Sequence, residues 1–219
     1  MTDAVVVLSG GQDSVTCLAL AVKKFGAGRV AAITFEYGQR HSEETVFAAA
    51  AAEHFAIPRH KVVRMDFFSE ISSSALLAPE GDFSKKKGGS CPDSVVEGRN
   101  AFFLGAAAVW AKTLGAHLLY AGMSETDFSG YPDCRAVFVR SIARSLSLAL
   151  DWKIKIETPL MRMTKADEWA LAAKLGIFDY IDRNTLTCYN GIPGDGCGKC
   201  PSCRLRRRGK REFLKGAKK

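Results

Sequence analysis

The chain has 219 residues, 47% hydrophobic and 25% charged, a balance typical of a water-soluble globular protein with one core, or a core and a small appendage. The formal net charge is +8, but residues 204–219 hold nine Lys or Arg and one Glu, so the whole excess lies there and residues 1–203 are neutral. This distribution argues against a basic nucleic-acid-binding body, and the lack of any run of about 18 apolar residues excludes a membrane-spanning helix.

Apolar runs alternate with helical patterns along most of the chain. The first run begins directly after residue 3, which leaves no room for a signal peptide, and we expect a cytoplasmic protein. Strands are predicted at 5–8, 29–37, 61–65, 117–121 and 154–157, and helices at 13–20, 42–55, 100–114, 136–150 and 164–176. The alternation predicts a doubly wound α/β fold, with a mainly parallel five-stranded sheet covered by helices on both faces. We expect this domain over 1–180 and a small C-terminal segment over 181–219.

The turn after the first strand is built to hold an anion. Ser9-Gly10-Gly11 follows the strand, and Asp13-Ser14 opens the helix behind it. The glycines leave the backbone N–H groups unhindered, and the helix N-terminus adds donors and a partial positive charge, which suits phosphate. The lysine-bearing pattern GxxxxGK[ST] is absent. Ser-Gly-Gly-x-Asp-Ser instead resembles the loop of the ATP pyrophosphatases, which release pyrophosphate while adenylating a substrate. The alternative is an ordinary glycine-rich turn.

Polar residues follow the next two strands, at the sheet edge where ligands bind in such folds. Arg40 and His41 could contact phosphate or carboxylate there, or could cap a helix with exposed charges. The stretch 67–98 is long for a compact domain, which is typical of a lid or a disordered segment. It ends at Arg99 and Asn100, which meet a helix N-terminus directed at the same edge.

The loop after the fourth strand, 122–135, is the richest in polar residues. Its acids could bind Mg²⁺, and its aromatic and basic side chains could hold a planar ligand, although surface loops share this composition. Beyond the fifth strand, Lys165 lies in the first turn of a helix that Thr164 and Asp167 cap. A lysine there opposes the helix dipole, which indicates that it faces a phosphate.

Four cysteines near the C-terminus have metal-ligand spacing. Cys188, Cys197, Cys200 and Cys203 form C-x8-C-x2-C-x2-C among glycine and proline turns. Four thiolates suit a closed, structural Zn²⁺ site, and an iron–sulfur cluster is the alternative. Cys17 is expected in the core, and Cys134 is a less favoured candidate nucleophile. The basic tail that follows is expected to be solvated or packed against a second subunit, the alternative being an acidic partner or RNA.

Taken together, these motifs identify a family. The chain resembles the 7-cyano-7-deazaguanine synthases in six stretches: 9–14, 37–41, 98–100, 127–135, 158–165 and 187–203. The resemblance runs from Val5 to about Phe213. The segment Ser-Gly-Tyr-Pro-Asp-Cys-Arg with the cysteine spacing is highly specific. Two positions depart mildly from the family pattern: Glu36 stands where aspartate is expected, which changes a carboxylate side chain, and Glu97 stands where proline is expected, which affects only loop geometry.

The resemblance implies an activity, its cofactors and its residues. In the implied reaction, 7-carboxy-7-deazaguanine, ammonia and ATP yield the 7-cyano base, a precursor of queuosine. The resemblance also implies a homodimer with one structural Zn²⁺ per chain and with Mg²⁺ bound together with ATP. Stable binding of nucleic acid is not expected. ATP would be bound by Leu8, Ser9, Gly10, Gly11, Gln12, Asp13, Ser14, Val15 and Thr16. The expected catalytic residues are Asp13, Asp127, Asp133 and Lys165, with acids holding Mg²⁺ and Lys165 neutralising phosphate. The expected substrate-binding residues are Arg40, His41, Arg99, Asn100, Phe128, Tyr131 and Arg135.

Two other functions stay open. A tRNA thiolation enzyme shares the pyrophosphatase loop but needs an iron–sulfur cluster or reactive cysteines and a tRNA-binding domain. A zinc-ribbon nucleic-acid binder would use the cysteines and the basic tail but leaves the phosphate loop unexplained. The neutral body of the chain disfavours both.

Overall fold

A five-stranded parallel sheet forms the centre of the protein. The computed structural model describes residues 1–217 apart from 39–42, 73, 75, 78–94 and 126–130. The strand order is β3-β2-β1-β4-β5, and every neighbouring pair is parallel. The strands are β1 (Ala4–Val7), β2 (Val30–Glu36), β3 (Arg59–Arg64), β4 (Leu118–Tyr120) and β5 (Lys155–Glu157). The predicted sheet is confirmed, and its order reverses between β1 and β4, the point at which such folds bind ligands.

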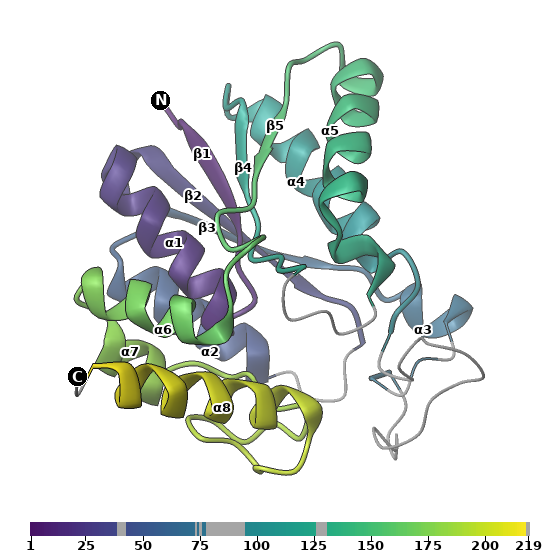
Figure 1. The fold of residues 1–219 in the computed structure, drawn as a ribbon. Coiled ribbons are helices and arrows are strands. Elements are labelled where there is room, and N and C mark those ends of the chain that lie inside the picture. Colours follow the sequence, from purple (N-terminus) through teal and green to yellow (C-terminus); the bar gives the residue numbers. More distant parts are fainter. Residues whose placement is uncertain (39–42, 73, 75, 78–94, 126–130, 218–219) are drawn as a thin grey trace.

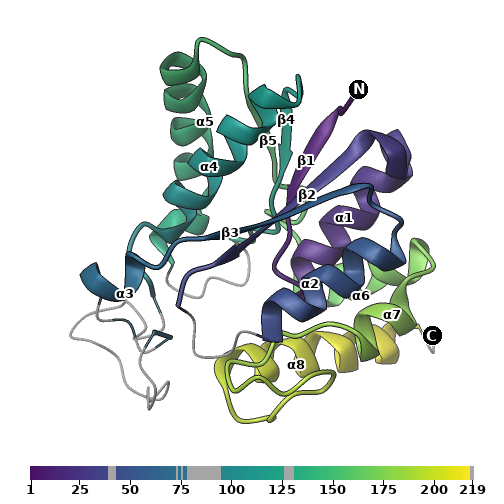
Figure 2. The ribbon, with the colours of Figure 1, turned by 180° about the vertical axis from the view of Figure 1, so that it is seen from behind.

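Helices cover both faces of the sheet (Figure 1). They are α1 (Gln12–Phe25), α2 (Glu43–His54), α3 (Phe68–Ile71), α4 (Arg99–Thr113), α5 (Ala136–Leu150), α6 (Lys165–Lys174), α7 (Phe178–Arg183) and α8 (Pro201–Gly216), with short 3-10 turns η1 (Ala27–Arg29) and η2 (Pro132–Cys134). Helices α4 and α5 lie on one face, and α1, α2, α6, α7 and α8 on the other (Figure 2). Successive residues of β1 bury alternately into these two layers, Val5 with α4 and Val6 with α1. Because both layers are apolar, β1 is an uninterrupted apolar run, Ala-Val-Val-Val.

The predicted elements match the structure closely, and the structure adds the helices α3, α7 and α8. The capping box is present: Thr164 Oγ1 accepts from the Asp167 amide at 3.2 Å, and Asp167 Oδ2 accepts from the Thr164 amide at 2.9 Å. The segment 67–98 includes the short helix α3, and α7 follows α6 without a clear sequence signal. None of the helices in the described ranges combines the length and apolarity needed to cross a bilayer. The boundary near residue 180 stays a prediction.

The basic tail forms a helix with one face packed against α6, while most of its described basic side chains are exposed, so the expectation of a solvated end is wrong for the packed face only. Helix α8 crosses α6, and its buried face carries Cys203, Arg206 and Gly209. A Cβ on Gly209 would overlap Lys165 Cβ and lie 2.7 Å from the Lys165 carbonyl carbon. The two helices therefore approach closely only because this residue has no side chain.

Gly209→Ala is expected to destabilise the protein by about 1–3 kcal/mol, because the added methyl group forces α8 away from α6. Thermal unfolding followed by circular dichroism measures the change. Gly216→Ala is the control in the same helix, since a Cβ added there would meet nothing within 4 Å. It should leave the melting temperature unchanged or raise it slightly. Equal melting temperatures for the two variants would contradict the close crossing.

Candidate functional site

A cavity of about 300 Å³ opens at the carboxyl ends of β1, β2 and β4. Its walls come from several stretches of chain that are far apart in sequence. They include Leu8, Ser9, Gly11, Gln12, Asp13, Ser14, Tyr37, Glu44, Arg99, Asn100, Phe103, Gly122, Tyr131, Cys134, Leu186, Thr187 and Tyr189. The predicted phosphate loop and three predicted substrate residues, Arg99, Asn100 and Tyr131, thus share one cavity.

Other predicted site residues lie elsewhere. Gly10, Val15, Thr16, Lys165, Asp133 and Arg135 are not among the lining residues. Arg40, His41, Asp127 and Phe128 fall outside the described residues. Arg135 is exposed, and its Nε donates to the Pro132 carbonyl at 3.0 Å. Its substrate-binding role stays a prediction.

The loop between β1 and α1 is held tightly in place. Ser14 Oγ accepts from the Ser9 amide at 3.1 Å and donates to the Gly11 carbonyl at 3.0 Å. Gly10 has a φ of 77°, and a Cβ there would lie 2.7 Å from the Ala48 amide nitrogen of α2. Only glycine allows this approach, which directs the first turn of α1 at the cavity.

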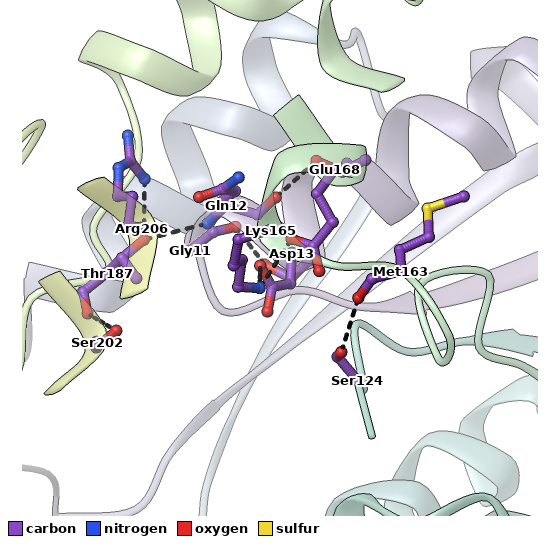
Figure 3. Close-up of polar contacts among 12 residues, drawn as sticks. Gly11, Gln12, Asp13, Ser124, Met163, Lys165, Glu168, Thr187, Ser202 and Arg206 are labelled. Carbon is purple, nitrogen blue, oxygen red and sulfur yellow. Dashed lines mark hydrogen bonds and ion pairs between the residues drawn. The ribbon is translucent and has the colours of Figure 1, made fainter. Parts of the chain in front are cut away.

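Asp13 is joined to a buried lysine and a second carboxyl group (Figure 3). Lys165 Nζ donates to Asp13 Oδ1 at 2.7 Å and to Glu168 Oε2 at 2.8 Å. The Lys165 side chain is 9% exposed and that of Glu168 is fully buried, whereas Asp13 is 31% exposed. Burial, and then the charge of Asp13, raise the pKa of Glu168 well above its ordinary value. Lys165 therefore reaches Asp13 from behind the cavity, and its contact with phosphate stays a prediction.

A second group of polar residues lines the same cavity as the loop. Arg99 Nη1 donates to the Tyr37 hydroxyl at 2.8 Å, and its guanidinium lies 5.3 Å from the centre of that ring. The hydroxyl groups of Tyr131 and Tyr189 are 3.4 Å apart. A half-buried cation beside aromatic rings and hydroxyl groups suits a planar ligand that carries a carboxylate. Sequence reasoning missed Tyr37 and Tyr189 as individual site residues, although both lie in motifs that it singled out.

Asp133 and Cys134 both contact Asn100 at the start of α4. Asp133 is buried, and its Oδ2 accepts from the Asn100 amide at 3.0 Å, which fixes the start of α4. Asn100 Nδ2 lies 3.5 Å from Cys134 Sγ. Burial, followed by the charge of Asp133, raises the pKa of Cys134 to about 11. The thiol is therefore protonated at neutral pH, which disfavours it as a nucleophile.

Glu44 is a cavity residue that the sequence did not single out. Burial raises its pKa from the ordinary value of 4.5 to about 7, although Arg99 acts in the opposite direction. The folded protein therefore binds this proton more tightly than the unfolded chain does. Through this group, the free energy of unfolding falls as pH rises from about 4.5 to about 7.

Glu44→Gln is expected to remove this dependence. The melting temperature of the variant, relative to wild type, should be higher at about pH 8 than at about pH 5. Differential scanning calorimetry at the two pH values measures this, and Glu53→Gln, an exposed site on the same helix, is the control. If the variant and wild type differ in melting temperature by the same amount at both pH values, Glu44 does not titrate in this range.

The four predicted cysteines come together beside this cavity. The sulfur atoms of Cys188, Cys197, Cys200 and Cys203 all lie within 4.8 Å of one another, close to the ~3.8 Å that a tetrahedron with 2.3 Å metal–sulfur bonds requires. The amides of Lys199 and Cys200 donate to Cys197 Sγ at 3.4 and 3.3 Å. A Cβ on Gly196 would overlap Cys203 Sγ. A set of four sulfur atoms with amide donors fits a closed metal site.

Comparisons with known proteins give the family and the fold. The family model described as "Queuosine biosynthesis protein QueC" matches residues 3–214. Among solved structures, a 4-thiouridine synthetase in complex with RNA and bound ATP superimposes with a TM-score of 0.53 at 16% sequence identity. The alignment covers 97% of this chain and 50% of the synthetase, so this chain spans half its length. At this identity the likeness shows the fold alone.

Proposed function

Because the chain belongs to the QueC family of queuosine biosynthesis proteins, we propose that it is the ATP-dependent ligase that makes 7-cyano-7-deazaguanine from 7-carboxy-7-deazaguanine and ammonia. The observation that carries this proposal is that residues of the Ser9–Ser14 loop line the same cavity as Arg99 and Tyr37. The loop suits phosphate, and Arg99 with Tyr37 suits a planar acid.

The proposed chemistry has two activation steps. The substrate carboxylate attacks the α-phosphorus of ATP, and pyrophosphate leaves as the acyl adenylate forms. Ammonia then displaces AMP to give the amide and releases one proton. A second ATP adenylates the amide oxygen with loss of pyrophosphate and a proton, and the loss of AMP and a further proton leaves the nitrile. Activation is needed because a carboxylate is a poor acyl donor.

The residues of the cavity have distinct roles in this scheme. The loop Ser9–Ser14 would stabilise the charge that grows on the departing pyrophosphate. Asp13 would hold Mg²⁺, which neutralises phosphate charge when it is bound with ATP. Arg99 would pair with the substrate carboxylate, and Tyr131 would stack on the deazapurine ring. The acids Asp127 and Asp133 are the proposed acceptors for its amino group. Four cysteines would hold one Zn²⁺, whose contribution is folding free energy.

Mass spectrometry and nucleotide analysis test the proposal. Purified protein with the carboxy-deazaguanine, ammonium and ATP should yield the nitrile with two AMP and two pyrophosphate per nitrile formed. ADP as the sole nucleotide product would exclude adenylation. Sulfur incorporation into tRNA would instead support the thiolation alternative, for which the synthetase likeness gives the fold only.

We also propose a homodimer, on the basis of the neutral body, the basic C-terminal end and the family. Light scattering at micromolar concentration should give about twice the chain mass of 23.8 kDa. A mass that matches one chain would contradict this proposal.

A further inference from the structure

The buried guanidinium of Arg206 donates its hydrogen bonds to neutral groups, with carboxylates only at longer range. Arg206 is 3% exposed, and its Nη1 donates to Thr185 Oγ1 at 2.7 Å and to Thr187 Oγ1 at 3.0 Å. Its Nη2 donates to the Ile181 carbonyl at 2.7 Å, and its guanidinium lies 5.2 Å from the centre of the Trp169 ring. Within the described part of the chain, no carboxylate hydrogen-bonds to it. Buried charges are normally paired, so this cation can stabilise an anion that arrives nearby.

Thr187 stands between this cation and the cavity. It lines the cavity, and its Oγ1 accepts from Arg206 Nη1 and from the amide of Gln12 at 3.5 Å (Figure 3). A hydroxyl group has two acceptor positions and one hydrogen. Both acceptor positions of Thr187 are used, and the part of the structure that is described holds no acceptor for its hydrogen. This hydrogen is therefore available to a ligand in the cavity.

The backbone around Thr187 is fixed against the phosphate loop. The Leu186 amide donates to the Gly10 carbonyl at 3.0 Å, and the Thr187 carbonyl accepts from Ser202 Oγ at 2.8 Å. The first bond joins this segment to the loop before α1, and the second joins it to α8. The hydroxyl of Thr187 is thus held at the loop by the same helix that carries Cys203.

Thr185 has a different arrangement although it binds the same nitrogen of Arg206. Its Oγ1 donates to the Ile181 carbonyl at 2.6 Å, so its hydrogen is already used. It is fully buried and is not among the cavity residues. Thr185 therefore only anchors Arg206, whereas Thr187 anchors it and can also donate a hydrogen bond into the cavity.

We propose that Thr187 binds an anion in this site: its hydroxyl donates to a phosphate oxygen of the nucleotide, or of the released pyrophosphate, held by the loop Ser9–Ser14. Arg206 is a positioning residue that orients and polarises this hydroxyl. This inference rests on the proposed function. If Thr187 binds phosphate, the segment 185–203, which carries the four cysteines, is part of the nucleotide site.

Calorimetric titration of the full-length, metal-loaded protein tests the inference, with magnesium pyrophosphate and magnesium α,β-methylene-ATP as probes. Thr187→Val keeps the side-chain shape and removes the donor, so both probes should bind about tenfold or more weakly. Thr187→Ser restores the hydroxyl and should stay within about threefold of wild type. Thr185→Val, the matched control, should lower the melting temperature but leave both affinities within about threefold. Metal content should match wild type in all three variants.

The outcomes distinguish this inference from the proposed function. Wild-type protein that binds neither probe would overturn both. Wild-type binding that Thr187→Val leaves intact would overturn the role of Thr187 alone, as would an equal loss in Thr185→Val, which would indicate a packing effect. If Thr187→Val does not fold, Thr187→Ala makes the same test, since it removes the donor and adds no steric demand.

Discussion

Turnover of the Asp13→Asn variant is expected to fall by at least about a hundredfold, while its melting temperature stays within about 5 °C of wild type. The Asp13 carboxylate lines the cavity beside the phosphate loop, and asparagine cannot supply the negative charge that Mg²⁺ requires. Stability is retained because Lys165 keeps a second partner. After burial, Asp13 is the next cause of the raised pKa of Glu168, so its removal lowers this pKa and strengthens the pairing of Glu168 with Lys165, which already lies 2.8 Å away.

Pyrophosphate release under saturating substrates measures this effect, and thermal unfolding measures the stability. Asp179→Asn is the control: it makes the same change in the first turn of α7, at a residue outside the cavity lining. Its turnover should equal that of wild type. Turnover of Asp13→Asn within a few-fold of wild type would remove Asp13 from the catalytic residues. A large fall in the melting temperature of Asp13→Asn would show that Glu168 does not replace Asp13 as the partner of Lys165.

The sequence predicted those features whose causes are local. The valine run of β1 predicted a strand buried on both faces, and the turn after it predicted an anion site because glycine and a helix N-terminus act within a few residues. The spacing of Cys197, Cys200 and Cys203 brings three sulfur atoms together in one turn and the start of a helix. In each case, short-range geometry was sufficient.

The features that were missed depend on partners far apart in sequence. The dipole of α6 singled out Lys165, but the sequence could not show that Asp13, 152 residues away, and Glu168 accept its hydrogen bonds; its contact with phosphate stays a prediction. The buried face of α8 was hidden because Arg206 and Gly209 form it where apolar residues would be expected. Arginine can be buried there since hydroxyl and carbonyl groups from 181–187 accept its hydrogen bonds. No periodicity of hydrophobic residues could reveal this face.

Loss of the metal is expected to open the nucleotide cavity while the sheet stays folded. The Cys197→Ser variant removes one sulfur ligand, and Leu186, Thr187 and Tyr189 line the cavity next to Cys188. Metal binding supplies on the order of 10 kcal/mol to folding in small zinc peptides. Only part of this should be lost here, because the two apolar layers around the sheet do not include the cysteine cluster.

Hydrogen exchange with mass spectrometry measures where the protein loosens. Exchange should rise over 185–216 and stay unchanged in β1 and β2, and the affinity for α,β-methylene-ATP should fall together with the metal content. Gly196→Ala keeps all four thiols but places a Cβ against Cys203 Sγ, so it should lose metal as well. Cys134→Ser lies outside the cluster and should retain the metal.

Elemental analysis decides the identity of the metal. Wild-type protein should contain close to one zinc per chain and little iron, because four thiolates in a closed tetrahedral set leave no position for reaction. Bound iron with sulfide would overturn the zinc proposal and revive the thiolation alternative. Full metal content in Cys197→Ser would show that this sulfur is not a ligand. Unchanged nucleotide affinity after complete metal loss would show that the wall formed by 186–189 is held by Arg206 and the Leu186–Gly10 hydrogen bond without the metal.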